Sequence, residues 1–151
     1  MEPKLEAIWI KRMKRGPMDP KEEAILVEGK GLKDNANQGG KRQVTIIEKE
    51  KWETVNAELN VDIDPRTRRA NLMVSGIDLA NSRGKFLAIG DTLIRMYGET
   101  RPCNRMEEAQ PGLQQALDPD WRGGAFGEVI KGGSIKVGDK VMWTEVAEEK
   151  A

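Results

Sequence analysis

Residues 86–97 read Phe86-Leu87-Ala88-Ile89-Gly90-Asp91-Thr92-Leu93-Ile94-Arg95-Met96-Tyr97, two apolar runs on either side of a Gly-Asp pair. A short pair of this kind between two such runs is typical of two strands joined by a turn or bend. Outward from this stretch, further short apolar runs alternate with glycine-rich segments along most of the chain. We therefore expect strands, and not helices, to form most of the fold.

The other expected strands are short and separated by polar or glycine-rich loops. Two loops are expected, at 14–20 and 33–41, because both are rich in glycine, proline or asparagine. The expected strands outside the opening stretch are 5–10, 24–27, 44–47, 72–74, 126–130 and 141–146, with Ile135 between two glycine turns near the end.

Two segments are expected to be helical. In the segment 48–59, Trp52, Val55 and Leu59 recur at helical spacing and form one apolar stripe. A second, irregular helix is expected to begin after Cys103, with Asn104 as its N-cap residue and Glu107 three positions later. Many strands with about two helices predict a mainly β fold, most simply a compact β-barrel.

The length and composition limit the class of protein. With 151 residues, the chain is expected to form one domain whose core spans about residues 5–146. Lys+Arg and Asp+Glu both number 25, so the overall basic charge that is typical of nucleic-acid-binding proteins is missing. No apolar run approaches the length of a membrane span, and the expected location is the cytoplasm.

Cys103 is the only cysteine, and the chain has no histidine. These counts exclude a Ser-His or Cys-His nucleophile pair, an intrachain disulfide and a zinc site built from cysteine and histidine. Arg101 and Arg105 flank Cys103, and nearby positive charge favours a thiolate. A small buried side chain without chemical function is the alternative interpretation of Cys103.

Three further segments combine basic residues with glycine or turn residues. Arg68 and Arg69 precede an expected strand, and arginines at a strand end can bind phosphate. Gly39-Gly40-Lys41-Arg42-Gln43 can cradle an anion, although it lacks the P-loop pattern. The segment 122–127 allows close backbone approach to a ligand. Solvated surface, a flexible loop and a tight turn, respectively, are the alternatives for these three segments.

Taken in order, these elements resemble the MOSC domain, which is named after the C-terminal domain of molybdenum cofactor sulfurase. The resemblance covers nearly the whole chain. Each element is weak by itself, and the specific feature is the ordered set together with the single cysteine. The matching elements are Gly39–Val44, Arg69–Leu72, Val74–Leu79, Gly90-Asp91, Pro102-Cys103, Arg122–Gly124, Gly132–Ile135 and Gly138-Asp139.

The resemblance implies a compact β-barrel whose pocket holds Cys103. In the family, this cysteine is proposed to bind molybdenum in a molybdopterin cofactor or to carry sulfur as a persulfide, and members that bind the cofactor reduce N-hydroxylated compounds. Carried onto this chain, Cys103 is the metal ligand or sulfur carrier, Arg69 and Asn71 hold the pterin phosphate and its surroundings, and Pro102 shapes the cysteine loop. Lys41, Arg42 and Arg101 complete the expected cofactor-binding set.

The chain departs from the family pattern at one place. Many members have a Gly-Asp-x-His element before the glycine-rich loop, whereas the stretch 31–37 here contains no histidine. Any role of that histidine in ligand binding cannot apply to this chain. The fold is therefore implied more strongly than the cofactor-dependent reduction.

Three functions remain open from the sequence. The first is a molybdenum-cofactor-dependent reductase that takes electrons from a donor protein. The second is a sulfur carrier with a persulfide on Cys103. In the family, pyridoxal-phosphate chemistry belongs to an aminotransferase-like domain, which is not expected here. The sulfur would therefore come from a separate cysteine desulfurase. The third is a non-catalytic module that binds an anion or a protein partner. No nucleic acid or membrane is expected as a partner.

Overall fold

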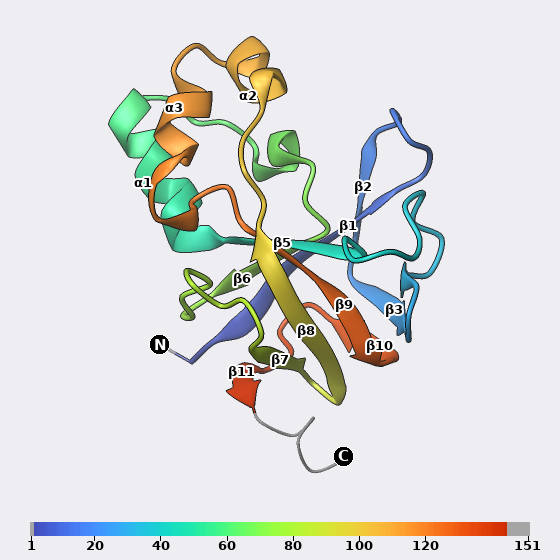
Figure 1. Cartoon of the computed structure of the whole chain (residues 1–151). Coiled ribbons are helices and arrows are strands. Elements are labelled where there is room, and N and C mark those ends of the chain that lie inside the picture. Colours follow the sequence, from blue (N-terminus) through green and yellow to red (C-terminus); the bar gives the residue numbers. More distant parts are fainter. Residues whose placement is uncertain (1, 145–151) are drawn as a thin grey trace.

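The computed structural model describes residues 2–144 and consists mainly of strands (Figure 1). The strands are β1 (Lys4–Lys11), β2 (Met18–Lys21), β3 (Glu23–Val27), β4 (Gly31–Leu32), β5 (Val44–Glu48), β6 (Leu72–Ser75), β7 (Phe86–Ile89), β8 (Thr92–Glu99), β9 (Ala125–Lys131), β10 (Gly133–Lys136) and β11 (Val141–Thr144). The α-helices are α1 (Lys49–Leu59), α2 (Asn104–Ala109) and α3 (Leu113–Leu117), and the 3-10 helices are η1 (Pro65–Arg68) and η2 (Pro119–Trp121).

One large sheet organises the molecule, with the strand order β11-β7-β8-β9-β5-β6-β1-β2. The opening stretch of the sequence analysis forms the antiparallel pair β7–β8, in which Leu87 faces Ile94. The pair β5–β6 is parallel, and α1 lies in the connection between these two strands. A helical crossover is what a parallel pair requires, because a tight turn cannot join strands that run in the same direction.

The large sheet curls until its far ends meet, although no continuous ladder closes it. Lys4 at the start of β1 and Lys140 just before β11 form an isolated antiparallel bridge. The Leu5 amide donates to the Asp139 carbonyl at 2.9 Å, and the Gly138 amide donates to the Leu5 carbonyl at 2.8 Å. We call this junction the seam. The prediction of a mainly β fold with a few helices is confirmed, and the sheet is barrel-like.

The interior of the curled sheet is the main hydrophobic core. A smaller sheet, with the order β10-β3-β4, contributes side chains to the same core. Apolar side chains alternate with outward-facing ones along the strands, as the pleat of a half-buried strand requires. The bulkiest fully buried members of this core are Leu5, Ile8, Leu26, Leu32, Ile46, Leu72, Leu79, Leu87, Ile89, Ile94 and Met96.

The three α-helices gather at one end of the molecule, above the sheet in Figure 1. A second apolar cluster joins α1 to α2 and α3, and it contains Trp52 and Val55 of the predicted stripe, with Leu59 partly buried beside them. The indole nitrogen of Trp52 donates to the Ile63 carbonyl at 2.9 Å. Trp52 is therefore a packing residue with its polar group satisfied.

Several local predictions are wrong or incomplete. Cys103, not Asn104, is the N-cap residue of α2, and its side chain makes no capping hydrogen bond. The Glu107 carboxylate accepts from the amides of Gly112 and Gln114 instead, at the start of α3. The expected loop 14–20 enters strand β2 at Met18. The last two residues of the expected strand and core, 145 and 146, lie outside the described residues.

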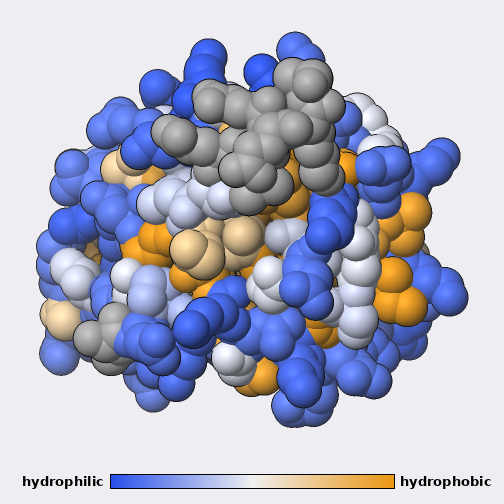
Figure 2. All heavy atoms as spheres, turned by 90° about the horizontal axis from the view of Figure 1, so that it is seen from below, coloured by the Kyte–Doolittle hydropathy of each residue, from blue (hydrophilic) through white to orange (hydrophobic). Residues whose placement is uncertain are grey.

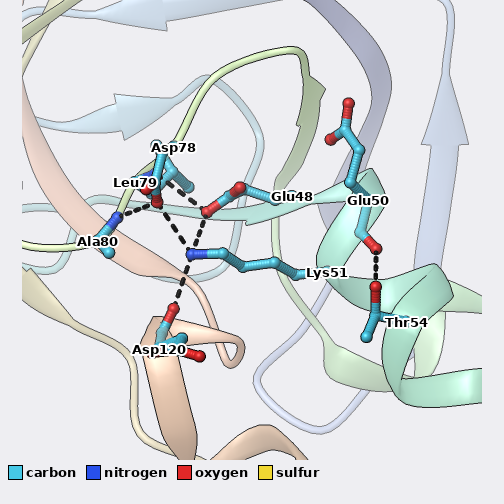
Figure 3. A network of polar contacts seen from close by, with 8 residues as sticks. All are labelled: Glu48, Glu50, Lys51, Thr54, Asp78, Leu79, Ala80 and Asp120. Atoms are coloured by element: carbon cyan, nitrogen blue, oxygen red, sulfur yellow. Dashed lines mark hydrogen bonds and ion pairs between the residues drawn. The ribbon is translucent and has the colours of Figure 1, made fainter. Parts of the chain in front are cut away.

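A polar network ties the beginning of α1 to two loops (Figure 3). The Lys51 Nζ lies 2.9 Å from Glu48 Oε2 and 3.0 Å from Asp78 Oδ1, and it donates to the Asp120 carbonyl at 2.7 Å. Glu48 Oε2 also accepts from the Leu79 amide at 3.0 Å. Burial raises the pKa of Glu48, whereas the hydrogen bonds from Leu79 and Lys51 act in the opposite direction.

The surface is mostly hydrophilic, with small separate apolar areas on the face shown in Figure 2. The large apolar side chains that are most exposed are Met13, Ile25, Val137 and Met142. Among the described residues, no helix has the length and apolar character needed to cross a membrane.

Candidate functional site

A cavity of about 200 Å³ lies where β5 meets η1, the loop after β4 and the segment that follows β8. It contains the cysteine, and we call it the cysteine cavity. Its polar lining includes Asn35, Asn37, Gln43, Thr45, Asn71 and Thr100. The hydroxyl of Thr100 is buried and has no hydrogen-bond partner among the described residues, so it is available to a ligand.

Positive charge dominates the cysteine cavity. Among the described residues that line it, none is acidic and five are cationic: Lys11, Arg42, Arg68, Arg69 and Arg105. Burial is the largest cause that lowers the pKa of Lys11, followed by the charges of Arg69 and Arg105. A group of cations without a carboxylate among the described lining residues favours an anionic ligand.

Arg68 is the buried member of this cation group, with a residue exposure of 8%. Its Nε donates to the Gly123 carbonyl at 3.0 Å, and its Nη2 donates to the carbonyls of Thr100 at 2.9 Å and Arg101 at 3.3 Å. Burial lowers the pKa of Arg68, whereas the nearby Cys103 raises it. Arg68 therefore fixes the backbone on the approach to the cysteine and brings its positive charge near the thiol.

Cys103 is exposed and lines the cavity. It stands at the junction between the extended segment 100–102 and helix α2, and its carbonyl accepts from the Met106 amide at 2.9 Å. The interpretation of Cys103 as a small buried side chain is wrong. An exposed thiol beside several cations has the surroundings of a reactive or metal-binding cysteine.

Asn71 lies in the cavity wall, but its side chain is engaged within the protein. Its Oδ1 accepts from the amide and the hydroxyl of Thr45, both at 3.2 Å. Its Nδ2 donates to the Trp9 carbonyl at 3.3 Å and to Asn35 Oδ1 at 3.2 Å. Asn71 thus connects β1, β5 and the loop after β4, and it positions the wall of the cavity.

Arg69 follows η1 in the left-handed region, with a φ of 62°. This backbone turn directs Arg69 differently from Arg68, although both line the cavity. Its Nη2 donates to the Gly16 carbonyl at 2.8 Å, which anchors the loop between β1 and β2. The other guanidinium nitrogens of Arg69 make no hydrogen bond within the described chain.

The structure brings four of the seven predicted site residues to the cavity: Arg42, Arg69, Asn71 and Cys103. Lys41, Arg101 and Pro102 are not in its lining. The Lys41 amine lies over the Tyr97 ring, 5.8 Å from its centroid, and the Arg101 side chain is 79% exposed beside Glu99. Pro102 packs near Gly123, where an added Cβ would lie 3.3 Å from the proline Cδ.

The glycine-rich segments serve the protein's own backbone. Gly39 and Gly40 have positive φ values of 74° and 70°, and a Cβ on either would contact nothing. The buried Gln43 amide nitrogen holds this loop through the carbonyls of Gly29 and Gly40. A Cβ on Gly124 would collide with the Ile46 carbonyl oxygen, so the close approach at that glycine is to β5 and not to a ligand.

The site contains residues that the sequence analysis did not assign to it. Lys11 and Asn35 come from strand β1 and a distant loop, and no sequence pattern links them to the cysteine. Arg68 and Arg105 lay within the segments already singled out, next to Arg69 and Cys103. Their positions in the sequence therefore indicated that they could belong to the site, but the sequence did not show the direction of either side chain.

Comparisons with protein families and solved structures identify the family and the fold of the chain. The MOSC domain model matches residues 33–142, so the chain belongs to the MOSC domain family. This family is associated with binding of the molybdenum cofactor. No curated protein was found that matches the chain.

Solved structures show the same fold. YuaD from Bacillus subtilis superimposes with a TM-score of 0.77 at 21% sequence identity, over 93% of this chain and 94% of that protein. YiiM from Geobacillus stearothermophilus superimposes with a TM-score of 0.76 at 14% identity, over 95% of this chain and 75% of that protein. YiiM from Escherichia coli gives 0.69 at 17% identity, over 94% and 70%.

Proposed function

We propose that this protein binds the molybdenum cofactor in the cysteine cavity, with Cys103 as the protein ligand of molybdenum. The observation that supports this most directly is an exposed thiol in a cavity lined by five cations and, among the described residues, no carboxylate. A thiolate is a suitable soft donor for molybdenum, and a pterin phosphate is a suitable anion for the cations.

The residues of the cavity fit such a group in charge and in donor chemistry. Arg69, Arg105 and Arg42 would hold the phosphate, since guanidinium groups bind phosphate oxygens in a bidentate manner. The unpartnered hydroxyl of Thr100 adds one further polar contact. Among the described residues, no cluster of three or more His, Cys, Asp or Glu side chains could hold a metal ion, so Cys103 would be the protein's contribution to a metal that the pterin also binds.

The proposed activity is the reduction of an N-hydroxylated compound to the corresponding amine and water. Molybdenum, when bound, would exchange two electrons with the substrate. A separate electron-donor protein provides these electrons, and solvent provides two protons. Lys11 is the amine of the cavity, and its lowered pKa lets it donate a proton more readily than the neighbouring arginines can. Arg68 keeps the cysteine loop in place during this reaction. A reducing compartment such as the cytoplasm keeps the thiol available.

The test is the molybdenum and pterin content of protein from a host that makes molybdopterin. Wild type should contain about one molybdenum and one pterin per protein molecule. Cys103→Ser should lose molybdenum, while its thermal stability stays unchanged because the thiol is exposed. Arg105→Gln should lower the pterin content, and Arg101→Gln should not, since only Arg105 lines the cavity. Wild type without metal and pterin, from a host that loads a known molybdenum protein, would contradict the proposal.

Sulfur transfer is a second candidate, favoured by the exposure of Cys103. In this reaction, the Cys103 thiolate attacks the terminal sulfur of a cysteine persulfide on a desulfurase. The sulfur–sulfur bond of the donor breaks, a persulfide forms on Cys103, and the desulfurase thiolate leaves. Intact-mass spectrometry after incubation with a cysteine desulfurase and cysteine should show one added sulfur in wild type and none in Cys103→Ser. An unchanged mass in wild type would contradict sulfur transfer.

A further inference from the structure

A second hollow, of about 370 Å³, lies on the outward face of strands β8 and β9. Its side chains come from four separate parts of the chain: the loop before β5, the turn before β7, β8 and β9. The residues that give it its chemical character are Lys41, Arg83, Arg95, Tyr97 and Phe126. None of the three cations lines the cysteine cavity, so these residues form a separate site, which we call the aromatic hollow.

The strand pleat explains how these side chains come together. Along β8, Ile94 and Met96 point into the core, whereas Arg95 and Tyr97 point outward. Phe126 of β9 lies opposite Gly98 in the register of the two strands. A Cβ on Gly98 would lie 3.4 Å from Arg83 Nη2 and 3.5 Å from a ring carbon of Phe126. The missing side chain at Gly98 therefore leaves a place that Arg83 and Phe126 share.

The cations of the aromatic hollow are not neutralised by the rest of the described chain. Lys41, Arg83 and Arg95 are exposed, and none of their side chains forms an ion pair or a hydrogen bond with another described residue. Lys41 and Arg95 lie 5.8 Å and 5.5 Å from the centroid of the Tyr97 ring. A cation in contact with the face of an aromatic ring can move to an anionic ligand that binds it more strongly. The ring face is then free to stack on a base.

Tyr97 is held in place independently of these cations. Its hydroxyl donates to Glu128 Oε1 at 2.6 Å, so the ring stays fixed by a neighbouring strand. The backbone of Phe126 lies in β9 opposite Thr45 and Gly98, and the centroid of its ring lies 4.7 Å from the Arg42 guanidinium. The hollow therefore presents the rings of Tyr97 and Phe126 together with three cations that form no ion pair with a described residue. The neighbouring carboxylate, Glu128, is engaged by the Tyr97 hydroxyl.

We propose that the aromatic hollow binds a nucleotide, with its base stacked on the rings of Tyr97 and Phe126 and its phosphate held by Arg83, Arg95 and Lys41. Aromatic rings stack on any nucleobase, and arginines match the oxygens of a phosphate. A purely apolar ligand would leave the cations without a role, and a simple anion would not use the rings. The ligand class that uses both is a phosphorylated nucleoside.

The aromatic hollow borders the cysteine cavity. Thr45 lines the cavity and faces Phe126 across the β5–β9 ladder. The Arg42 guanidinium, which also lines the cavity, lies 4.7 Å from the centroid of the Phe126 ring. A nucleotide in the hollow thus sits beside the mouth of the cavity. The proposal does not depend on what the cavity itself binds.

Isothermal titration calorimetry with AMP, adenosine and ribose 5-phosphate tests the proposal. AMP should bind wild type about tenfold more tightly than either fragment, because each fragment keeps one half of the interaction. In Phe126→Leu, the affinity for AMP should fall close to the affinity for ribose 5-phosphate. In Arg83→Gln, the affinity for AMP should fall close to the affinity for adenosine. Tyr97→Leu provides a second ring variant if Phe126→Leu does not fold, as judged by circular dichroism.

Matched variants separate the two sites. Lys41→Gln should weaken AMP binding several-fold, whereas Lys136→Gln, which removes the same charge from exposed strand β10, should not. Arg105→Gln in the cysteine cavity should leave AMP binding unchanged, and Arg83→Gln should leave the molybdenum content unchanged. Failure of nucleotide binding is therefore distinguishable from failure of the proposed function.

Two results would overturn the proposal. The first is equal binding of AMP, adenosine and ribose 5-phosphate, including no measurable binding of any of them. The second is loss of AMP binding in Arg105→Gln with full binding in Arg83→Gln, which would place the nucleotide in the cysteine cavity. A single-stranded hexanucleotide is titrated in the same way. If it binds while AMP does not, the hollow binds a nucleic acid strand, and the proposal of a free nucleotide is wrong.

Discussion

Arg68 satisfies three backbone carbonyls with one guanidinium group, and the shape of the cysteine cavity depends on this contact. Two of these carbonyls, those of Thr100 and Arg101, precede the cysteine, and the third belongs to Gly123 on the opposite side. A Cβ on Gly123 would lie 2.5 Å from the Thr100 carbonyl oxygen, so the two segments pack at backbone distance. The arginine and the glycine together keep the thiol at the edge of the cavity.

Replacing Arg68 by alanine should therefore destabilise the fold as well as the site. We expect Arg68→Ala to lower the free energy of unfolding by roughly 2–4 kcal/mol, because buried carbonyls lose a charged donor. Urea denaturation measures this value. Arg66→Ala is the control from the same 3-10 helix, since Arg66 is half exposed and pairs with Asp64; it should stay within about 0.5 kcal/mol of wild type. Equal stability of the two variants would contradict the structural role of Arg68.

The pair Arg68 and Arg69 also shows the limit of prediction at single residues. The sequence indicated that this segment carries anion-binding arginines, and both line the cavity. The left-handed backbone at Arg69 decides which of the two arginines is buried. The sequence did not predict this conformation, because it is typical of glycine or asparagine and the residue here is arginine. Lys11 could not be predicted either, because its place in the cavity follows from the pairing of β1 with β6, about sixty residues later in the chain.

Helix α1 begins where Glu48, Lys51 and Asp78 meet, and this network joins the helix to the loops before β7 and around η2 (Figure 3). Its central carboxyl group is buried at the end of a strand. Burial raises the pKa of Glu48 from its ordinary value of 4.5, whereas hydrogen bonds from Ala80 and Lys51 lower the pKa of the more exposed Asp78. The two carboxyl groups of one network therefore contribute to the pH dependence of stability with opposite signs.

The raised pKa of Glu48 has a defined consequence for stability. A carboxyl group whose pKa is higher in the folded protein contributes stability below its unfolded-state pKa, and that contribution is lost as the pH rises through the folded-state pKa. Glu48→Gln has no such group. The free energy of unfolding of Glu48→Gln relative to wild type should therefore increase as the pH rises from about 4 to about 7, as measured by urea denaturation at several pH values.

The contribution of Asp78 has the opposite sign, but it is present in both proteins and largely cancels in the difference. Glu53→Gln serves as the matched loss of one exposed acidic group from the same helix. A difference between Glu48→Gln and wild type that stays flat, or that decreases with rising pH, would contradict the assignment.

Elements were predicted well where apolar periodicity determines them. The strands at 5–10, 44–47 and 86–97 were correct because their buried faces dictate the pattern. The start of α2 was not, because a capping pattern competes with long-range contacts. Glu107 matched the capping pattern, yet its carboxylate is drawn to the amides of Gly112 and Gln114 at the next helix. The proline and glycine at 111 and 112 divide the expected helix into α2 and α3.

At the scale of the whole molecule, the curled sheet places two different sites on neighbouring strands. The cysteine cavity uses Thr45 of β5, and the aromatic hollow uses Phe126 of β9, which faces Thr45 in the ladder. Both sites are rich in cations, although the chain has no net charge. No acidic residue lines either site among the described residues, so both sites present positive charge to a ligand. Composition alone could not predict this separation.

The seam between β1 and the segment before β11 depends on contacts that are remote in the sequence. Leu5 and Asp139 are 134 positions apart, whereas the Met96 amide donates to the carbonyl of Lys85, only 11 positions away. Contacts between distant residues cost more chain entropy and form more slowly. In pulse-labelling hydrogen exchange during refolding, we expect the Met96 amide to be protected before the Leu5 amide. Simultaneous protection, or the reverse order, would contradict this expectation.

The same feature has a consequence during synthesis on the ribosome. Strand β1 leaves the exit tunnel well before its backbone partners at 138–141, because Asp139 follows Leu5 by 134 positions in the chain. Until then, the nascent chain carries the beginning of β1 without the neighbour that covers it. An uncovered strand edge is a site for unwanted pairing with another chain. The exposed charges of Glu2, just before this strand, and Lys4, its first residue, provide the kind of protection that a newly made chain needs during this interval.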